Sequence, residues 1–138
     1  MPGCVLRVQS KTLDVQILIN ASHLRPIAIH RKGHLRVPGS PYVSRASGFN
    51  VEVGRGNDGR VERQSRDAIR FLKRHAAGLR RLRRCQSFAG MTLDFGLYDR
   101  TTEERPWPSY RLPSALIELA GEHGIEIQLS FYGHGQAG

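Results

Sequence analysis

The sequence predicts an α+β fold, a two-layer sandwich in which helices cover one face of a mostly antiparallel sheet. Segments with strand-like alternation and segments with helical periodicity follow one another in the order β-α-β-β-α-β-α-β. The alternation within the strands gives the sheet one apolar face for the helices and one polar face. This order is ferredoxin-like with an added helix and strand.

The length and composition of the chain fit a single domain that spans residues 1–138. A chain of 138 residues can bury one core without disulfide or metal support, and a hydrophobic content of 39% is typical of a globular protein. No repeat or linker divides the chain. The Gly-rich segment 133–138 is predicted to be a frayed tail.

In the first half of the chain, the sequence predicts strands over residues 5–8, 27–30 and 49–53 and a short helix over residues 15–19. Asp14 precedes this helix and is expected to cap it, because a carboxylate accepts the free backbone N–H groups of a first turn. Residues 31–47 are rich in Gly, Pro, Ser and Arg, so we expect an exposed loop there.

In the second half, the sequence predicts strands over residues 91–97 and 125–131, a long helix over residues 61–85 and a shorter helix between Pro113 and Gly124. Gly78 is less favourable than Ala in a helix by about 1 kcal/mol, which leaves a kink or an end at this position open. Apolar residues three, four or seven apart define the buried stripe of the long helix: Val61, Ala68, Ile69, Leu72, Ala76, Leu79 and Leu82.

The net charge of +9 is concentrated in one segment of the chain. Between Arg55 and Arg84, ten arginines and one lysine stand against three acidic residues, a net +8, and the rest is nearly balanced. At about 1.5 Å per residue, the basic side chains opposite the apolar stripe would form a ridge roughly 30 Å long. They are Arg63, Arg66, Arg70, Lys73, Arg74, Arg80, Arg81 and Arg84.

Three interpretations of this basic ridge are open. The planar guanidinium fork binds carboxylates and phosphates, so the ridge is suited to an acidic protein surface or to nucleic acid. The third interpretation is a solvated helix face without a partner. No stacking aromatic residues alternate with these arginines, and no known nucleic-acid-binding motif is present, which favours a protein partner over nucleic acid.

A second candidate partner surface is the loop over residues 105–111, which contains Trp107 and Tyr110. Trp, Tyr and Arg dominate binding hot spots, and the prolines on either side of Trp107 stiffen the loop, so that less entropy is lost on binding. The alternative interpretation is a Trp side chain that folds back over the edge of the core.

The polar positions of the predicted strands form a third candidate site. If Glu52, Asp94 and Glu126 converge on the open face of the sheet, their carboxylates are suited to acid–base chemistry or to a divalent cation. The alternative is an ordinary solvent-facing sheet surface. The residues expected on this face are Arg7, His30, Asn50, Glu52, Thr92, Asp94, Glu126, Gln128 and Ser130.

The sequence contains no recognisable motif for catalysis, metal binding or cofactor binding. Cys4 and Cys85 lie far apart without CxxC spacing and are expected to be buried apolar residues. His30 and His34 are four residues apart, but their strand-like flanks argue against a helix that presents both to a metal. Phosphate-loop and nucleophile-elbow motifs are absent. We therefore expect a protein that is not an enzyme and has no cofactor.

The chain also lacks the sequence signals of secretion and membrane insertion. The first residues contain no basic segment followed by an apolar run, and no apolar stretch approaches the roughly 20 residues needed to span a bilayer. We expect a soluble, cytoplasmic protein. The oligomeric state is left open, because an exposed edge strand is able to pair two copies but nothing in the sequence requires it.

Four segments of the chain, 4–8, 47–53, 92–96 and 119–132, resemble a family of small bacterial proteins of unknown function. The likeness follows the same order over most of the chain. This likeness implies homology, but it identifies no catalytic residue in the chain. Compact proteins of this kind often resemble immunity proteins, which neutralise a toxin. The resemblance thus implies a toxin or effector as the protein partner, and the residues expected to bind it are Arg63, Arg66, Arg70, Arg74, Arg81, Trp107 and Tyr110.

Overall fold

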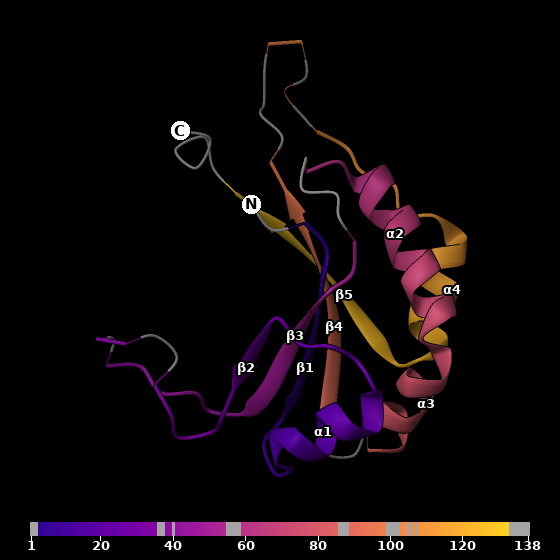
Figure 1. Cartoon of the computed structure of the whole chain (residues 1–138). Helices are drawn as coiled ribbons and strands as arrows, with labels where there is room; N and C mark the ends of the chain where they lie inside the picture. The colour runs from indigo at the N-terminus through magenta and orange to yellow at the C-terminus, as the bar shows by residue number, and fades with distance from the viewer. Residues whose placement is uncertain are drawn as a thin grey trace.

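The structure is a computed structural model that describes residues 3–35, 38–39, 41–54, 59–85, 89–98, 103–104, 106 and 108–132. It contains β1 (Val5–Ser10), α1 (Val15–Ser22), β2 (Ala28–His30), β3 (Ser47–Glu52), α2 (Val61–Arg74), α3 (Ala76–Arg84), β4 (Ala89–Leu97), α4 (Ser114–Glu122) and β5 (Ile125–Phe131) (Figure 1). Residues 133–138, predicted to be a frayed tail, lie outside the described residues.

The five strands form one mixed sheet in the order β2-β3-β1-β4-β5. Every neighbouring pair is antiparallel except β4 and β5, which are parallel and connected by α4. Strands β1 to β4 therefore have the order and directions of the ferredoxin-like split β-α-β arrangement, and α4 with β5 is the addition. The predicted fold class, a mostly antiparallel two-layer α+β sandwich, is confirmed.

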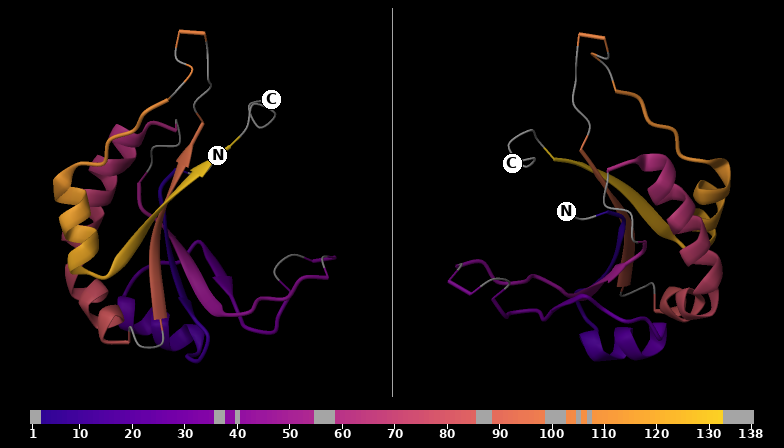
Figure 2. Two further views of the ribbon diagram at one scale, coloured as in Figure 1. Left: turned by 180° about the vertical axis from the view of Figure 1, so that it is seen from behind. Right: turned by 45° about the horizontal axis from the view of Figure 1, so that its top comes forward.

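The helices form the second layer of the sandwich. Helices α2, α3 and α4 run along one face of the sheet, and α1 contacts α3, β1 and β3 at the lower end (Figures 1 and 2). Helix α1 begins as predicted, because an Asp14 carboxylate oxygen accepts the Gln16 backbone N–H at 3.0 Å. Helix α4 ends before Gly124, whose φ of 67° favours glycine.

The register of the strands places alternate residues in the core. Leu6 pairs with Val51 and Leu93, and Val8 pairs with Phe49 and Met91, so one set of side chains faces the helices. All six are buried. Burying one such side chain stabilises the fold by about 1.5–3 kcal/mol relative to its exposed state. The intervening residues form the open face of the sheet, as the alternation predicts.

The prediction of one long helix over residues 61–85 is wrong, because this segment forms two helices. The break lies at His75, whose φ of −104° and ψ of 20° depart from helical values, and not at Gly78. The bend turns α3 toward α1, where Gly78 lies against the carbonyl oxygen of Ser22. A Cβ at this position would clash with that oxygen. Gly78 therefore permits close helix packing and does not end the helix.

A buried glutamine attaches α2 to the sheet. β1 pairs with β4 only as far as Asp94, so the backbone of Gly96 has no strand partner on that side. The Gln64 side chain replaces it, donating to the Gly96 carbonyl at 2.8 Å and accepting from the Gly96 N–H at 3.2 Å. Both bonds are buried, so they satisfy polar groups that would otherwise destabilise the core. This contact fixes the position of α2.

Candidate functional site

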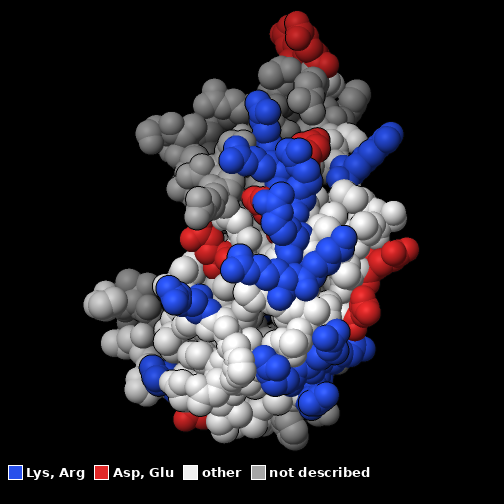
Figure 3. Space-filling model, turned by 45° about the vertical axis from the view of Figure 1, so that its right-hand side comes forward, with Lys and Arg blue, Asp and Glu red and all other residues white. Residues whose placement is uncertain are grey.

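One side of α2 carries a stripe of exposed basic side chains, which we call the α2 basic face. Basic residues recur at spacings of three or four along this helix, while Ala68 and Leu72 on its opposite side are buried. Figure 3 shows Lys and Arg side chains gathered along the helix. The members of the α2 basic face are Arg63, Arg66, Arg70, Lys73 and Arg74.

The basic residues of α3 do not continue this stripe. Arg80 and Arg84 are exposed on α3, beyond the break at His75. Figure 3 shows basic side chains in more than one group on this side of the molecule. Arg81 is half-buried, and its Nε donates a hydrogen bond of 2.6 Å to the backbone carbonyl of Ala21. Of the arginines predicted to bind a partner, Arg81 therefore joins α3 to α1. The continuous ridge of roughly 30 Å is replaced by two shorter groups.

The positive charge of the α2 basic face is only partly compensated by Asp67, which lines a shared hollow with Arg63, Arg70 and Arg74 on the same helix. Within the part of the chain that the structure describes, no carboxylate forms an ion pair with four of its members: Arg66, Arg70, Lys73 and Arg74. Like charges three or four residues apart on a helix destabilise it by a few tenths of a kcal/mol per pair. An anionic group bound across this face would relieve that repulsion. The face is therefore chemically suited to carboxylates or phosphates.

Acidic side chains border the α2 basic face. Helix α4 packs beside α2 and exposes Glu118 and Glu122, and Glu62 is exposed in the first turn of α2. Figure 3 shows carboxylates at the borders of the basic stripe. The stripe is therefore narrow, and it is not part of a broad positive surface. A partner that covers it also meets negative charge at its sides.

On the open face of the sheet, the structure assembles a hydrogen-bonded network around Asp94. One Asp94 oxygen accepts from Arg7 at 2.9 Å in an ion pair, and the other accepts from the Ser130 hydroxyl at 2.6 Å. Gln128 donates to Ser130 at 3.3 Å. Asp94 is buried, with 5% of its surface exposed. Its carboxylate is thus occupied by partners within the sheet.

The three carboxylates considered for acid–base chemistry are held apart. Val5 pairs with both Glu52 and Asp94, so these two acids lie two strands apart. Glu126 lies opposite Thr92 and not opposite Asp94. Among the described residues, no group of three or more metal-ligating side chains is found. This arrangement favours the interpretation of these acids as ordinary polar residues of an open sheet face.

The remaining predicted site residues have varied positions. Tyr110 is half-buried against the core, with its ring centroid 5.9 Å from that of Phe131. Trp107 lies outside the described residues.

Burial raises the pKa of the Cys4 thiol far above its ordinary value, and the charges of Asp94 and Asp67 add to the increase, so this thiol is unreactive. Cys85 was expected to be buried but is half-buried.

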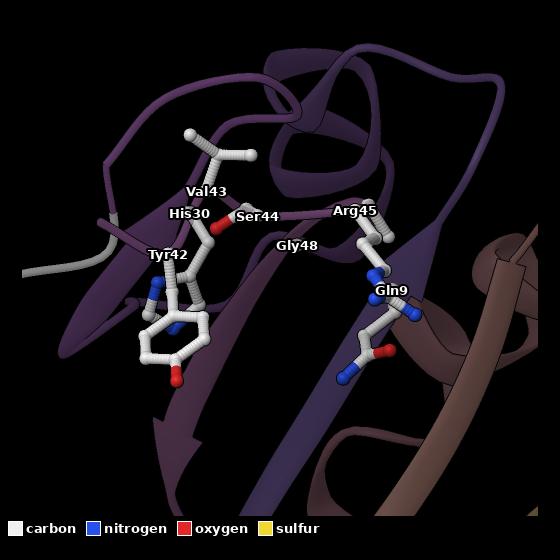
Figure 4. Close-up of a pocket in the computed structure, with 8 residues that line it drawn as sticks. Gln9, His30, Tyr42, Val43, Ser44, Arg45 and Gly48 are labelled. Atoms are coloured by element: carbon white, nitrogen blue, oxygen red, sulfur yellow. The ribbon is translucent and has the colours of Figure 1, made fainter. Parts of the chain in front are cut away.

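A hollow of about 380 Å³, which sequence analysis missed, opens on the same sheet face. Its floor comes from one row of the sheet, in which Gly48 pairs with both His30 and Gln9. Its walls come from residues 42–46 of the loop before β3 (Figure 4). Sequence analysis could not join these segments, because their proximity depends on strand register. We call this hollow the Gly48 hollow.

Family membership agrees with the fold but adds no activity. The chain belongs to the DUF4279 family, a domain of unknown function, whose family model matches residues 2–134. No curated protein and no solved structure matches the chain significantly. The helices of the described part of the chain are too short or too polar to cross a membrane. The expected resemblance to proteins of unknown function is therefore confirmed.

Proposed function

We propose that this protein is a non-enzymatic binding protein whose α2 basic face docks on an acidic surface of another protein. The observation that carries the proposal is the exposed row of Arg66, Arg70, Lys73 and Arg74 on α2, for which no ion pair with a carboxylate is found among the described residues. The helix holds this row rigidly, because Gln64 and the buried side of α2 attach it to the sheet. The backbone positions of these cations are therefore fixed before binding, and only their side chains lose conformational freedom when they meet carboxylates.

The acidic borders of the face favour a protein partner over nucleic acid. A nucleic acid presents a continuous row of phosphates, and a strand laid across α2 would bring some of them toward Glu118 and Glu122 on α4. A protein surface can place carboxylates opposite α2 and basic groups opposite α4. No exposed aromatic side chain for base stacking lies on the described surface of α2, since Phe71 is buried.

Within this class, we propose that the partner is a toxin or effector that the protein inhibits. Small inhibitors of this kind act by covering a functional surface, which requires a rigid compact fold and a charged docking face but no catalytic group. The two-layer sandwich and the α2 basic face meet these requirements. The proposal does not depend on Trp107, which can contribute a second contact.

The test is affinity capture of the tagged protein from a lysate of its own source, with and without nuclease, followed by mass spectrometry. We expect one dominant protein that survives nuclease treatment and is lost with the double variant Arg66→Glu and Arg70→Glu. Reversing two charges in a docked face weakens binding by several kcal/mol, enough to abolish capture. Both side chains are exposed, so the fold should persist.

A matched control reverses two exposed basic residues elsewhere, Lys11→Glu and Arg25→Glu, with the same change in net charge. Capture by this control variant should equal that of the wild type. Equal loss in both variants would show that only net charge matters and would refute the α2 basic face as the docking surface. Capture that disappears on nuclease treatment would instead establish the nucleic-acid alternative, with the same helix as the contact.

A further inference from the structure

We infer that the Gly48 hollow is a binding site for a small planar anion, an aromatic ring that carries a carboxylate or phosphate group. The hollow lies on the open face of the sheet, whereas α2 lies on the covered face. It is therefore independent of the proposed docking surface. Its volume of about 380 Å³ is at the lower end of the ligand-site range of about 300–1,000 Å³.

The floor of the hollow is low at its centre because its central residue has no side chain. Gly48 lies between His30 and Gln9 in one cross-strand row, and neighbouring strands are about 4.8 Å apart. The Gly48 backbone is itself buried, and the Gln9 Cγ lies 3.3 Å from the position that a Cβ at Gly48 would take. A planar ring in the hollow therefore lies over Gly48 and against the flanking side chains.

The walls supply an aromatic surface on one side and a cation on the other. Figure 4 shows the Tyr42 ring beside His30, and Arg45 on the opposite side with Gln9. Tyr42 is 75% exposed, so a bound ring would cover aromatic surface that is now in water. The guanidinium of Arg45 can hold a carboxylate or phosphate through two hydrogen bonds. The residues lining the hollow include no carboxylate to compete with the ligand.

Calorimetric titration with two anionic probes tests the site. Uridine 5′-monophosphate represents a ring with a phosphate, 4-hydroxybenzoate a ring with a carboxylate, and uridine an uncharged ring. We expect at least one anion to bind saturably below about 10 mM and to bind at least about tenfold more tightly than uridine. The anion that binds more tightly shows whether the site prefers a phosphate or a carboxylate group.

Three single variants locate the binding. Arg45→Ala and Tyr42→Ala, both at exposed positions, should each weaken binding about tenfold, and the control Arg66→Ala on α2 should leave it unchanged. Ser44→Ala, whose hydroxyl is buried, should leave binding and the urea midpoint of the ligand-free protein nearly unchanged. The inference is overturned if neither anion saturates, or if binding is unaffected by both Arg45→Ala and Tyr42→Ala.

Discussion

Two glycines flank Gln9 on the open face of the sheet, and their surroundings differ. Gly48 and Gly90 are the register partners of Gln9 on β3 and β4. A Cβ at Gly48 would clash with the Val8 carbonyl oxygen, a backbone atom that cannot move without disturbing β1. A Cβ at Gly90 would meet no described atom within 4 Å. The fold therefore requires the first glycine and not the second.

We expect Gly48→Ala and Gly90→Ala to change stability in opposite directions. Gly90→Ala should raise the free energy of unfolding by about 0.4–1 kcal/mol, because Ala restricts the unfolded chain and fits the native strand. Gly48→Ala should lower it by about 1–3 kcal/mol through the clash with Val8. Urea denaturation of both variants measures the difference. A loss of stability in Gly90→Ala would show that this strand needs glycine for its backbone.

The bend between α2 and α3 shows packing overriding helix propensity. α3 contacts α1, and Gly78 allows the backbone of α3 to approach the Ser22 carbonyl closely. The Arg81 Nε donates a hydrogen bond to the Ala21 carbonyl beside this contact. The Ala21 carbonyl belongs to the C-terminal end of α1, where the last carbonyl groups have no partner within the helix. The bend thus brings α3 into contact with the C-terminal end of α1.

We expect Gly78→Ala to destabilise the protein, although Ala is the better helix former by about 1 kcal/mol. The added methyl group would push α3 away from Ser22 and strain the Arg81 hydrogen bond, a loss of about 1–3 kcal/mol. Thermal or urea unfolding measures the change. The control Ala77→Gly, at an exposed position of the same helix, reports propensity alone and should cost about 1 kcal/mol. A stabilised Gly78→Ala would mean that the helices separate freely.

The elements that the sequence predicts best are those with one buried face. Strand β5 has its predicted bounds of Ile125–Phe131, and α1 begins at its predicted cap, Asp14, because alternation and capping are local signals. The break at His75 carries no such signal, since neither Gly nor Pro occupies it. It results from contacts between α3 and α1, which are distant in sequence. Local patterns therefore predict elements and miss their bends.

The candidate sites differ in the same way, because one depends on a local sequence pattern and the other on contacts between distant segments. The α2 basic face was predicted because its residues share one helix, so helical spacing alone places them together. The Gly48 hollow joins β1, β2, β3 and the loop before β3, and only the strand register brings these segments into contact. The ion pair of Arg7 with Asp94 likewise depends on the pairing of β1 with β4. Neither could be read from spacing along the chain.

In the whole molecule, the sheet separates the two candidate sites. The helix layer presents the α2 basic face to one side, and the open sheet face presents the Gly48 hollow to the other. Arg45 supplies the positive charge at the hollow, whereas α2 carries five basic and two acidic residues. Protein docking on α2 would leave the hollow accessible. A small anion could therefore bind while a partner protein is in place.

Two histidines in the helix layer connect the stability of the whole domain to pH. His123 is buried at the end of α4, and no described residue forms a hydrogen bond with its Nδ1. Burial lowers the pKa of His123, Glu122 raises it, and Arg80 and Arg83 lower it further, with a net decrease. Burial and the charge of Arg74 also lower the pKa of His75. Protonation of either imidazole is thus disfavoured in the folded protein.

We expect stability to fall as the pH drops below the ordinary histidine pKa of 6.5. Above that pH both imidazoles are neutral in the folded and unfolded chains and contribute nothing to pH dependence. Below it, the unfolded chain takes up protons that the folded chain excludes, so the free energy of unfolding decreases. Urea midpoints measured from about pH 8 to about pH 5 should be constant at first and then decline.

The variant His123→Gln should reduce this decline, because it removes the titrating group whose neighbours include Arg80 and Arg83. His34→Gln, which removes an exposed histidine outside the helix layer, is the matched control and should keep the wild-type decline. If both variants follow the wild-type curve, the buried imidazole does not link protons to folding. A smaller decline in His123→Gln alone would show that proton uptake by the His123 imidazole is linked to unfolding.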